Sequence, residues 1–143
     1  MYKTMYKKIL VALDATAADE TILKHVIGLA HTFDSSVALL HVADGWAARW
    51  FGPDAVSPEI DHDKGYLESI RARLAGEGLK VEAELAYGEP SDQIVQWIEQ
   101  HGCDLVAMST HGHRLISDML YGSIAEKVRH RVDVPVLLLK VQK

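Results

Sequence analysis

Residues 109–127, STHGHRLISDMLYGSIAEK, combine glycines and hydroxyl side chains at a spacing that could bind phosphate. Ser109, Gly112, Gly122 and Ser123 follow the pattern S-x2-G-x9-G-S, and the last pair leads into a segment of helical character. The first turn of a helix offers unpaired N–H groups and the positive end of the helix dipole, which both attract anions. Because glycine lets an anion approach the backbone closely, the pattern predicts a phosphate-binding loop.

The same residues also predict a simple helix start. Ser-Ile-Ala-Glu at 123–126 fits a capping box, in which Ser123 accepts a hydrogen bond from the amide of Glu126 and Glu126 reaches back. The phosphate motifs G-x-x-x-x-G-K-[ST] and G-x-G-x-x-G are both missing from the chain. Binding through backbone amides needs neither motif, so the phosphate loop and the helix cap both remain open.

Two histidines and an arginine lie inside this loop. His111 and His113 form an H-x-H pair that could reach one metal ion from an extended segment. No Cys, Asp or Glu lies at a matching short spacing, so we predict no metal site made by the protein itself. A Mg²⁺ or Mn²⁺ ion held by nucleotide phosphates fits better. Arg114 is close enough to Gly112 to reach a phosphate. Three further basic residues are expected to complement the carboxyl end of their helix: Lys127, Arg129 and Arg131.

Hydrophobic periodicity predicts strands alternating with helices. Continuous or alternating apolar runs indicate strands at 7–13, 36–42, 79–85, 104–109 and 134–141. Apolar residues at helical spacing indicate helices over 15–33, around 67–74, around 94–98 and over 123–131. His41, within the second strand, is expected to be a hydrogen-bonded histidine of the core or its rim.

This alternation predicts one α/β domain over 1–143, with a parallel five-stranded sheet covered by helices on both faces. The strictly alternating run at 79–85 fits an edge strand with one wetted face. Ligands of such sheets bind beyond the carboxyl ends of the strands, where the strand order reverses. Asp14 follows the first strand and Ser109 ends the fourth, so both face one crevice if these two strands are neighbours.

Composition limits the classes of function. The 20 acidic and 15 basic residues give a net charge of −5, which provides no general electrostatic footprint for nucleic acid or an anionic membrane. The single cysteine, Cys103, allows no internal disulfide and favours a reducing cytoplasm. No apolar run approaches the roughly 18 residues of a membrane span, and the N-terminal run lacks a signal-peptide cleavage region. We therefore expect a cytoplasmic protein with neither nucleic-acid nor membrane partners.

Three segments resemble the universal stress protein family: KILVALDAT at 8–16, GEPSDQIVQWIEQHGCDLVAMSTHG at 88–112 and LYGSIAEKVRHRVDVPVLLLK at 120–140. The resemblance covers nearly the whole chain and is loosest at 43–60. Nucleotide-binding members carry G-x2-G-x9-G-[ST]; here the spacing is intact, with Ser109 in place of the first glycine. The first strand has Ala12 where the family has proline, and it ends in DAT where the family typically has DGS.

The resemblance implies a doubly wound parallel five-stranded sheet of order 3-2-1-4-5 with four helices, flavodoxin- or Rossmann-like. It also implies an adenine-nucleotide-binding protein, with ATP or AMP as ligand, that acts as a cytoplasmic stress-response sensor or regulator. Asp14 would hold the ribose, Val42 would lie near the adenine, and Gly112, Gly122 and Ser123 would wrap the phosphates. The full set of implied nucleotide contacts is Ala12, Asp14, Val42, Met108, Ser109, His111, Gly112, His113, Arg114, Gly122 and Ser123. No catalytic residue is predicted, so ATP hydrolysis is expected to be slow at most. The alternatives are a nucleotide-free dimeric interaction module of the same fold and a slow nucleotide hydrolase.

Two further regions carry expectations. The strand at 134–141 lies at an edge of the predicted sheet and contains the apolar run VLLL, which invites pairing with a second copy. We therefore predict a homodimer in which these strands pair antiparallel about a two-fold axis, as the family resemblance also implies. Trp46, Trp50 and Phe51, in the loop at 43–58, are expected to form a hydrophobic plug over the sheet edge, or else a lid near the adenine or a partner surface.

Overall fold

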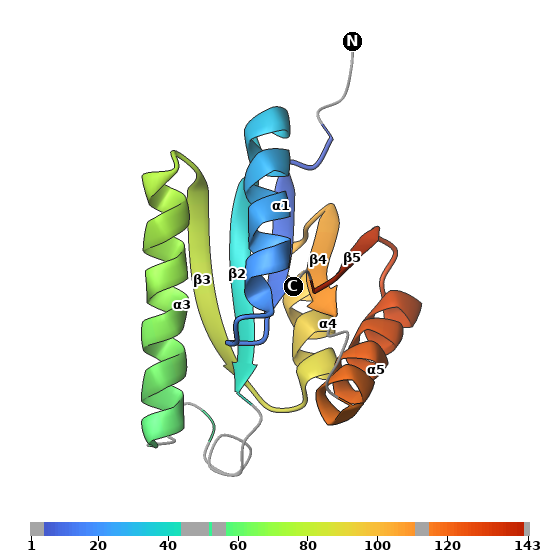
Figure 1. Cartoon of the computed structure of the whole chain (residues 1–143). Helices are drawn as coiled ribbons and strands as arrows, with labels where there is room; N and C mark the ends of the chain where they lie inside the picture. Colours follow the sequence, from blue (N-terminus) through green and yellow to red (C-terminus); the bar gives the residue numbers. More distant parts are fainter. Residues whose placement is uncertain (1–4, 44–51, 53–56, 111–114, 142–143) are drawn as a thin grey trace.

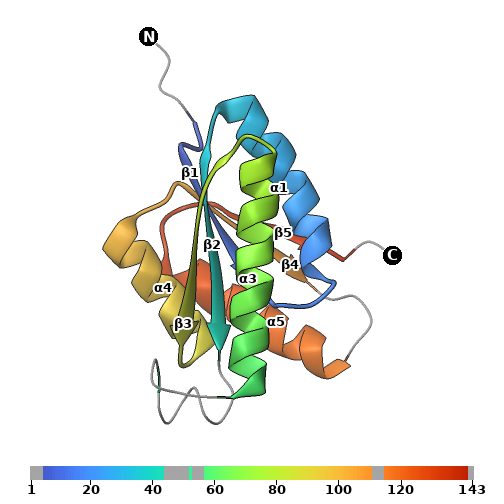
Figure 2. The same cartoon turned by 90° about the vertical axis from the view of Figure 1, so that its left-hand side faces the viewer.

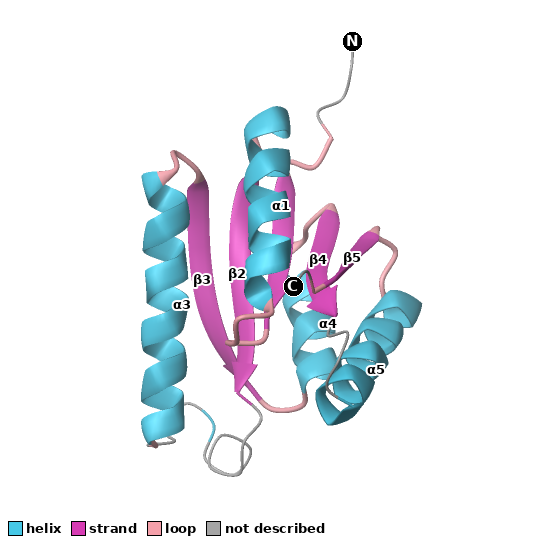
Figure 3. Cartoon of the chain, viewed as in Figure 1, coloured by secondary structure: helices cyan, strands magenta, loops and turns pink. Residues whose placement is uncertain are grey.

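The computed structural model describes residues 5–43, 52, 57–110 and 115–141, and of residues 115–122 the backbone only. Within these residues, strands and helices alternate along the chain (Figure 1, Figure 3). The elements are β1 Lys8–Leu13, α1 Asp19–Phe33, β2 Ser36–Ala43, α3 Pro58–Gly76, β3 Lys80–Tyr87, α4 Pro90–His101, β4 Leu105–Thr110, α5 Leu115–Arg131 and β5 Val136–Lys140. The aromatic side chains of the 43–58 loop and residues 111–114 lie outside the described residues, and the interpretations placed on them stay predictions.

The five strands form one parallel sheet in the order β3-β2-β1-β4-β5, which confirms the predicted topology. The central strands β1, β2 and β4 are buried almost throughout, as expected for apolar strands covered on both faces. Strand β3 is an edge, and exposed residues such as Lys80, Glu82 and Glu84 alternate along it with partly buried ones. The alternating run therefore marked an edge strand, although the strand extends to Tyr87.

Helices α1 and α3 cover one face of the sheet, and α4 and α5 cover the other (Figure 2). Successive strand side chains point to opposite faces, so β1 supplies Ile9 and Val11 to the α1/α3 side and Leu10 to the α4/α5 side. Each face thus has its own buried cluster. No helix among the described residues combines the length and apolar character needed to cross a bilayer.

Helix α5 differs from its prediction, because it begins at Leu115 rather than at Ser123. Ser123 therefore lies inside the helix, and the capping-box interpretation is wrong. The carboxylate of Glu126 instead interacts with Arg129 and His130, one turn further along. The physical reason is that one glycine inside a helix costs only about 1 kcal/mol relative to alanine, so Gly122 does not stop the helix.

Candidate functional site

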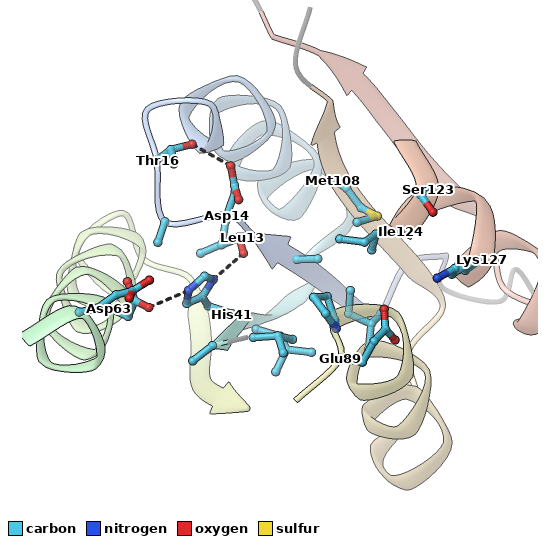
Figure 4. Close-up of a pocket in the computed structure, with 18 of the residues that line it drawn as sticks. Leu13, Asp14, Thr16, His41, Asp63, Glu89, Met108, Ser123, Ile124 and Lys127 are labelled. Atoms are coloured by element: carbon cyan, nitrogen blue, oxygen red, sulfur yellow. Dashed lines mark hydrogen bonds and ion pairs between the residues drawn. The ribbon is translucent and has the colours of Figure 1, made fainter. Parts of the chain in front are cut away.

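A pocket with a volume of about 520 Å³ lies at the carboxyl ends of the central strands (Figure 4). Strands β1 and β4 are neighbours, but the helices that follow them, α1 and α5, cover opposite faces of the sheet. The chain therefore diverges at this point and leaves a crevice, which is where open α/β sheets bind ligands. The volume is within the range of pockets that hold small molecules.

The pocket brings together residues that are far apart in the sequence. Of the predicted contacts, five line it: Ala12, Asp14, Val42, Met108 and Ser123. Gly122 belongs to the backbone of α5, and the predicted contacts His111, Gly112, His113 and Arg114 lie outside the described residues. The strand ends were thus correctly expected to meet at one edge of the sheet.

Ser109 does not line the pocket, unlike its neighbour Met108. The Ser109 side chain is 2% exposed, and its hydroxyl accepts a hydrogen bond from the backbone amide of Ile22 in α1 at 3.2 Å. Alternation along β4 directs these two side chains to opposite faces of the sheet. In this structure Ser109 therefore joins β4 to α1.

Asp14 occupies the wall of the pocket that follows β1. Its carboxylate Oδ2 accepts a hydrogen bond from the Thr16 hydroxyl at 3.0 Å, and the Thr16 oxygen accepts one from the amide of Ala18 at 3.2 Å. Between Asp14 and Thr16, Ala15 has a left-handed backbone with φ of 62°. Glycine is favoured in that region because it has no Cβ, so alanine at this position carries some backbone strain.

His41 and Asp63 form a buried pair on the α3 side of the pocket (Figure 4). The His41 Nδ1 donates to the carbonyl oxygen of Leu13 at 2.8 Å, since a carbonyl can only accept. The Nε2 lies 3.1 Å from Asp63 Oδ2, so this contact also requires a proton, carried by the ring or by the carboxyl group. The pair links the end of β1 to β2 and α3, and it confirms that His41 is a hydrogen-bonded histidine of the core rim.

Sequence reasoning did not identify Asp63 as a site residue, although a signal was present. Asp63 falls on the buried stripe of α3 together with Ile60, Leu67, Ile70 and Leu74. A carboxylate on an apolar stripe is costly to bury unless it is hydrogen-bonded. Its position on that stripe could therefore have indicated a buried polar partner.

The opposite wall comes from α5, which presents Ser123 and Lys127 to the pocket. These residues are four apart and therefore share one face of the helix. Lys127 was expected to complement the carboxyl end of its helix, but its side chain lines the pocket instead (Figure 4). Both residues are exposed, so the α5 wall places a hydroxyl and an ammonium group beside solvent.

Glu89 lies between the α5 wall and the start of α4. Its carboxylate accepts from the amide of Asp92 at 2.8 Å and from the Ser91 hydroxyl at 2.5 Å, which caps α4. Burial acts to raise the pKa of Glu89, but these hydrogen bonds and the charge of Lys127 lower it overall. Glu89 is therefore an ionised cap of α4 at neutral pH, and the positive charge of Lys127 interacts with the Glu89 carboxylate.

Chemically, the pocket has two unlike walls joined by an apolar floor. Carboxylates of Asp14, Glu59 and Asp63 occur on the side of β1 and α3, and the ammonium group of Lys127 occurs on the side of α5, near the carboxylate of Glu89. Val42 and Met108 belong to the apolar part between them. Such a site suits a ligand with hydroxyl groups at one end, an apolar body and negative charge at the other. Within the described residues, no group of three or more His, Cys, Asp or Glu side chains could together hold a metal ion.

Comparison with known proteins gives consistent matches along the chain. The sequence profile of the universal stress protein family matches residues 5–140. Universal stress protein MJ0531 of Methanocaldococcus jannaschii is 30% identical, over 99% of this chain and 86% of its own length. The solved structure of MJ0577, from the same organism, is 32% identical with a TM-score of 0.81, covering 97% of this chain and 99% of that one.

A third match adds a bound ligand in a protein of the same fold. The universal stress protein from Archaeoglobus fulgidus was solved in complex with dAMP. It is 22% identical, with a TM-score of 0.70, and the match covers 95% of this chain and 99% of that one.

Proposed function

The chain belongs to the universal stress protein family, and on this basis we propose that it binds an adenine nucleotide in the pocket at the carboxyl ends of β1, β2 and β4. The observation that carries the proposal is the opposition of Asp14 and Lys127 across that pocket (Figure 4). The dAMP complex of the Archaeoglobus protein supports the ligand class for this fold.

In the proposed complex the nucleotide spans the pocket from wall to wall. The Asp14 carboxylate accepts hydrogen bonds from the ribose hydroxyls, and Val42, with Ala12 and Met108 nearby, contacts the adenine or the sugar through apolar surface. Ser123 and Lys127 contact the phosphates, because a hydroxyl and an ammonium group both donate to phosphate oxygens. Gly112 and the polar residues His111, His113 and Arg114 complete the phosphate side in this proposal, and Ser109 acts indirectly by joining β4 to α1.

The proposed biological role is that of a cytoplasmic stress-response sensor or regulator. ATP and AMP are both candidate ligands, and the phosphates of ATP would hold any Mg²⁺ or Mn²⁺ ion. No pair of described residues is assigned as nucleophile and base, so hydrolysis in this proposal is slow at most. In this proposal the signal is nucleotide binding itself, because the fraction of occupied pockets depends on the nucleotide concentration.

A nucleotide-free interaction module is the second candidate, and one observation favours it. Helix α5 runs continuously through Gly122 and Ser123. Amides inside a helix donate to carbonyls four residues earlier and are not available to a phosphate. With α5 in this form, the backbone cradle predicted at the glycine–serine pair does not exist.

Mass spectrometry of freshly purified, denatured protein separates the two candidates, since it detects ATP, ADP or AMP carried through purification. Calorimetric titrations with adenosine, AMP and ATP then test the proposed orientation. We expect affinity to rise with each addition of phosphate charge. Absence of binding by all three ligands at millimolar concentration would leave the interaction module.

We also propose that two copies pair through residues 134–141. Strand β5 is an edge of the sheet, and Leu138 is 41% exposed although Leu137 and Leu139 pack against the core. A paired edge would cover this leucine and use the open backbone groups of the strand. Light scattering at micromolar concentration should give the mass of two chains, and Leu138→Lys should lower it. A single-chain mass for the unmutated protein would exclude this dimer.

A further inference from the structure

A buried carboxylate lies directly behind the turn that carries Asp14. Asp19 has no exposed surface, yet it is ionisable and lies at the start of α1. Its Oδ1 accepts a hydrogen bond from the amide of Asp14 at 2.8 Å, and its Oδ2 accepts one from the amide of Ala15 at 2.9 Å. The hydroxyl of Tyr66, from α3, donates to the same Oδ2 at 2.8 Å. Asp19 itself does not line the pocket.

The three hydrogen-bond donors stabilise the buried carboxylate of Asp19. Burial raises the pKa of Asp19 overall, because the charged form loses hydration, and the hydrogen bonds from Asp14 and Tyr66 offset part of that rise. Burial also raises the pKa of Tyr66, and the charge of Asp19 adds to that effect. Tyr66 therefore stays a neutral phenol that donates its proton, and α3 contributes directly to the β1–α1 turn.

The two backbone amides form an anion-binding arrangement. Consecutive N–H groups in a turn with a left-handed residue can converge on one anion, and Ala15 is that residue here, with φ of 62°. In many α/β proteins this first strand-to-helix turn is where a phosphate binds. In this chain the position opposite the amides is taken by the carboxylate of Asp19.

We propose that Asp19 is a positioning residue of the nucleotide site: as an internal anion it holds the amides of Asp14 and Ala15, and so keeps the Asp14 carboxylate on the pocket wall. The inference rests on the proposed function. The inference also adds an orientation of the ligand to that function, because the turn cannot accept a phosphate while the Asp19 carboxylate occupies the anion position. The sugar end of the ligand therefore faces this turn, and the phosphates lie toward Ser123 and Lys127.

The test compares Asp19→Ala and Asp19→Asn with Val26→Ala, a matched control that truncates a buried core residue of α1 away from the turn. Amide proton shifts of Asp14 and Ala15 in the free protein report the two hydrogen bonds directly. We expect both signals to move upfield in Asp19→Ala and to stay in place in Val26→Ala. Asp19→Asn keeps the size, but its NH₂ group must face at least one donor, so at least one signal should move.

Binding is measured with adenosine, which carries the ribose but no phosphate. We expect Asp19→Ala to raise the dissociation constant about ten-fold, the scale of one hydrogen bond to a charged group, and Val26→Ala to leave it unchanged. Adding inorganic phosphate should shift the amides of Asp14 and Ala15 in Asp19→Ala but not in the unmutated protein, since only the variant has the anion position open.

Each result bears on one part of the proposal. Unmoved amide signals in Asp19→Ala would overturn the role of Asp19 as an internal anion. Moved signals with adenosine affinity equal to that of Val26→Ala would overturn its role in positioning Asp14. If the unmutated protein binds neither adenosine nor AMP, the proposed function fails, and the spectra of the free proteins alone then decide whether Asp19 holds the turn.

Discussion

At the β1 end of the pocket Asp14, His41 and Asp63 are held by hydrogen bonds within the protein, whereas the α5 end presents exposed side chains from one helix. Asp14 is half-buried and accepts from Thr16, and behind it Asp19 holds two amides. Ser123 and Lys127 are exposed on a single face of α5. The hydrogen-bonded β1 end is preorganised and suits ligand hydroxyl groups in fixed positions. At the α5 end, the long flexible side chain of Lys127 can adjust to a mobile charged group.

Because the two ends of the pocket differ in this way, substitutions at one end should change mainly the free energy of unfolding, and substitutions at the other should change mainly nucleotide affinity. Substitutions on the β1 and α3 side should lower the free energy of unfolding, because they leave buried groups without partners. Substitutions on α5 should lower nucleotide affinity and leave the free energy of unfolding nearly unchanged, because exposed side chains contribute little to it. The following variants test that separation, from the largest expected effect to the smallest.

Asp63→Ala should have the largest effect on stability. It leaves the Nε2 of His41 without its buried carboxylate, and breaking such a pair costs about 3 kcal/mol of unfolding free energy. Asp61→Ala removes an exposed carboxylate from the same helix and should cost less than about 1 kcal/mol. Urea denaturation measures both; equal midpoints would show that the β1 and α3 wall is no more fixed than the surface.

Lys127→Ala should weaken ATP binding by about 1.5–3 kcal/mol, roughly ten- to hundred-fold, because it removes a charge-assisted contact with phosphate. Adenosine affinity and melting temperature should be unchanged. Arg129→Ala is the matched control, since Arg129 is an exposed cation of the same helix, interacts with Glu126 and does not line the pocket. An equal loss of ATP affinity in both variants would mean that only the general charge of α5 matters.

Thr16→Val removes the hydroxyl that orients Asp14 and keeps the size of the side chain. The amide of Ala18 and the carboxylate of Asp14 each lose a partner, so we expect a loss of about 1 kcal/mol in unfolding free energy. Adenosine affinity should fall a few-fold at the same time. An unchanged adenosine affinity beside a lowered melting temperature would separate the orientation of Asp14 from nucleotide binding.

Ser123→Ala should have the smallest effect, and its sign is informative. With Ser123 inside α5, alanine should leave the protein as stable or up to about 0.5 kcal/mol more stable, because alanine is the better helix former. Loss of the hydroxyl should weaken ATP binding by about 1 kcal/mol. A drop of about 1 kcal/mol in unfolding free energy would instead restore the interpretation of Ser123 as a helix cap.

The amino-acid sequence by itself determined the order of elements, the parallel sheet and the edge at which ligands bind, and the family resemblance of its motifs supplied the strand order. The order of elements follows from local periodicity, and the rule that ligands bind beyond the carboxyl ends of parallel strands drew attention to Asp14, which lines the pocket. Val42 and Met108, which the resemblance implies as nucleotide contacts, line the same pocket. Side chains alternate between the two faces of the sheet along β4, so Ser109 and Met108 point to opposite faces. The sequence motif nevertheless indicated Ser109 as a nucleotide contact.

Only the tertiary structure decided which distant side chains pair behind and around that edge. His41 meets Asp63 across two elements, and Tyr66 reaches Asp19 although 47 positions separate them along the chain. Lys127 lines the pocket because α5 packs on the sheet with the face of Ser123 and Lys127 beside the ends of β1 and β4. Such contacts depend on how the helices pack on the sheet, and side-chain periodicity does not encode that packing. The helices and strands themselves depend on short-range patterns, which side-chain periodicity does encode.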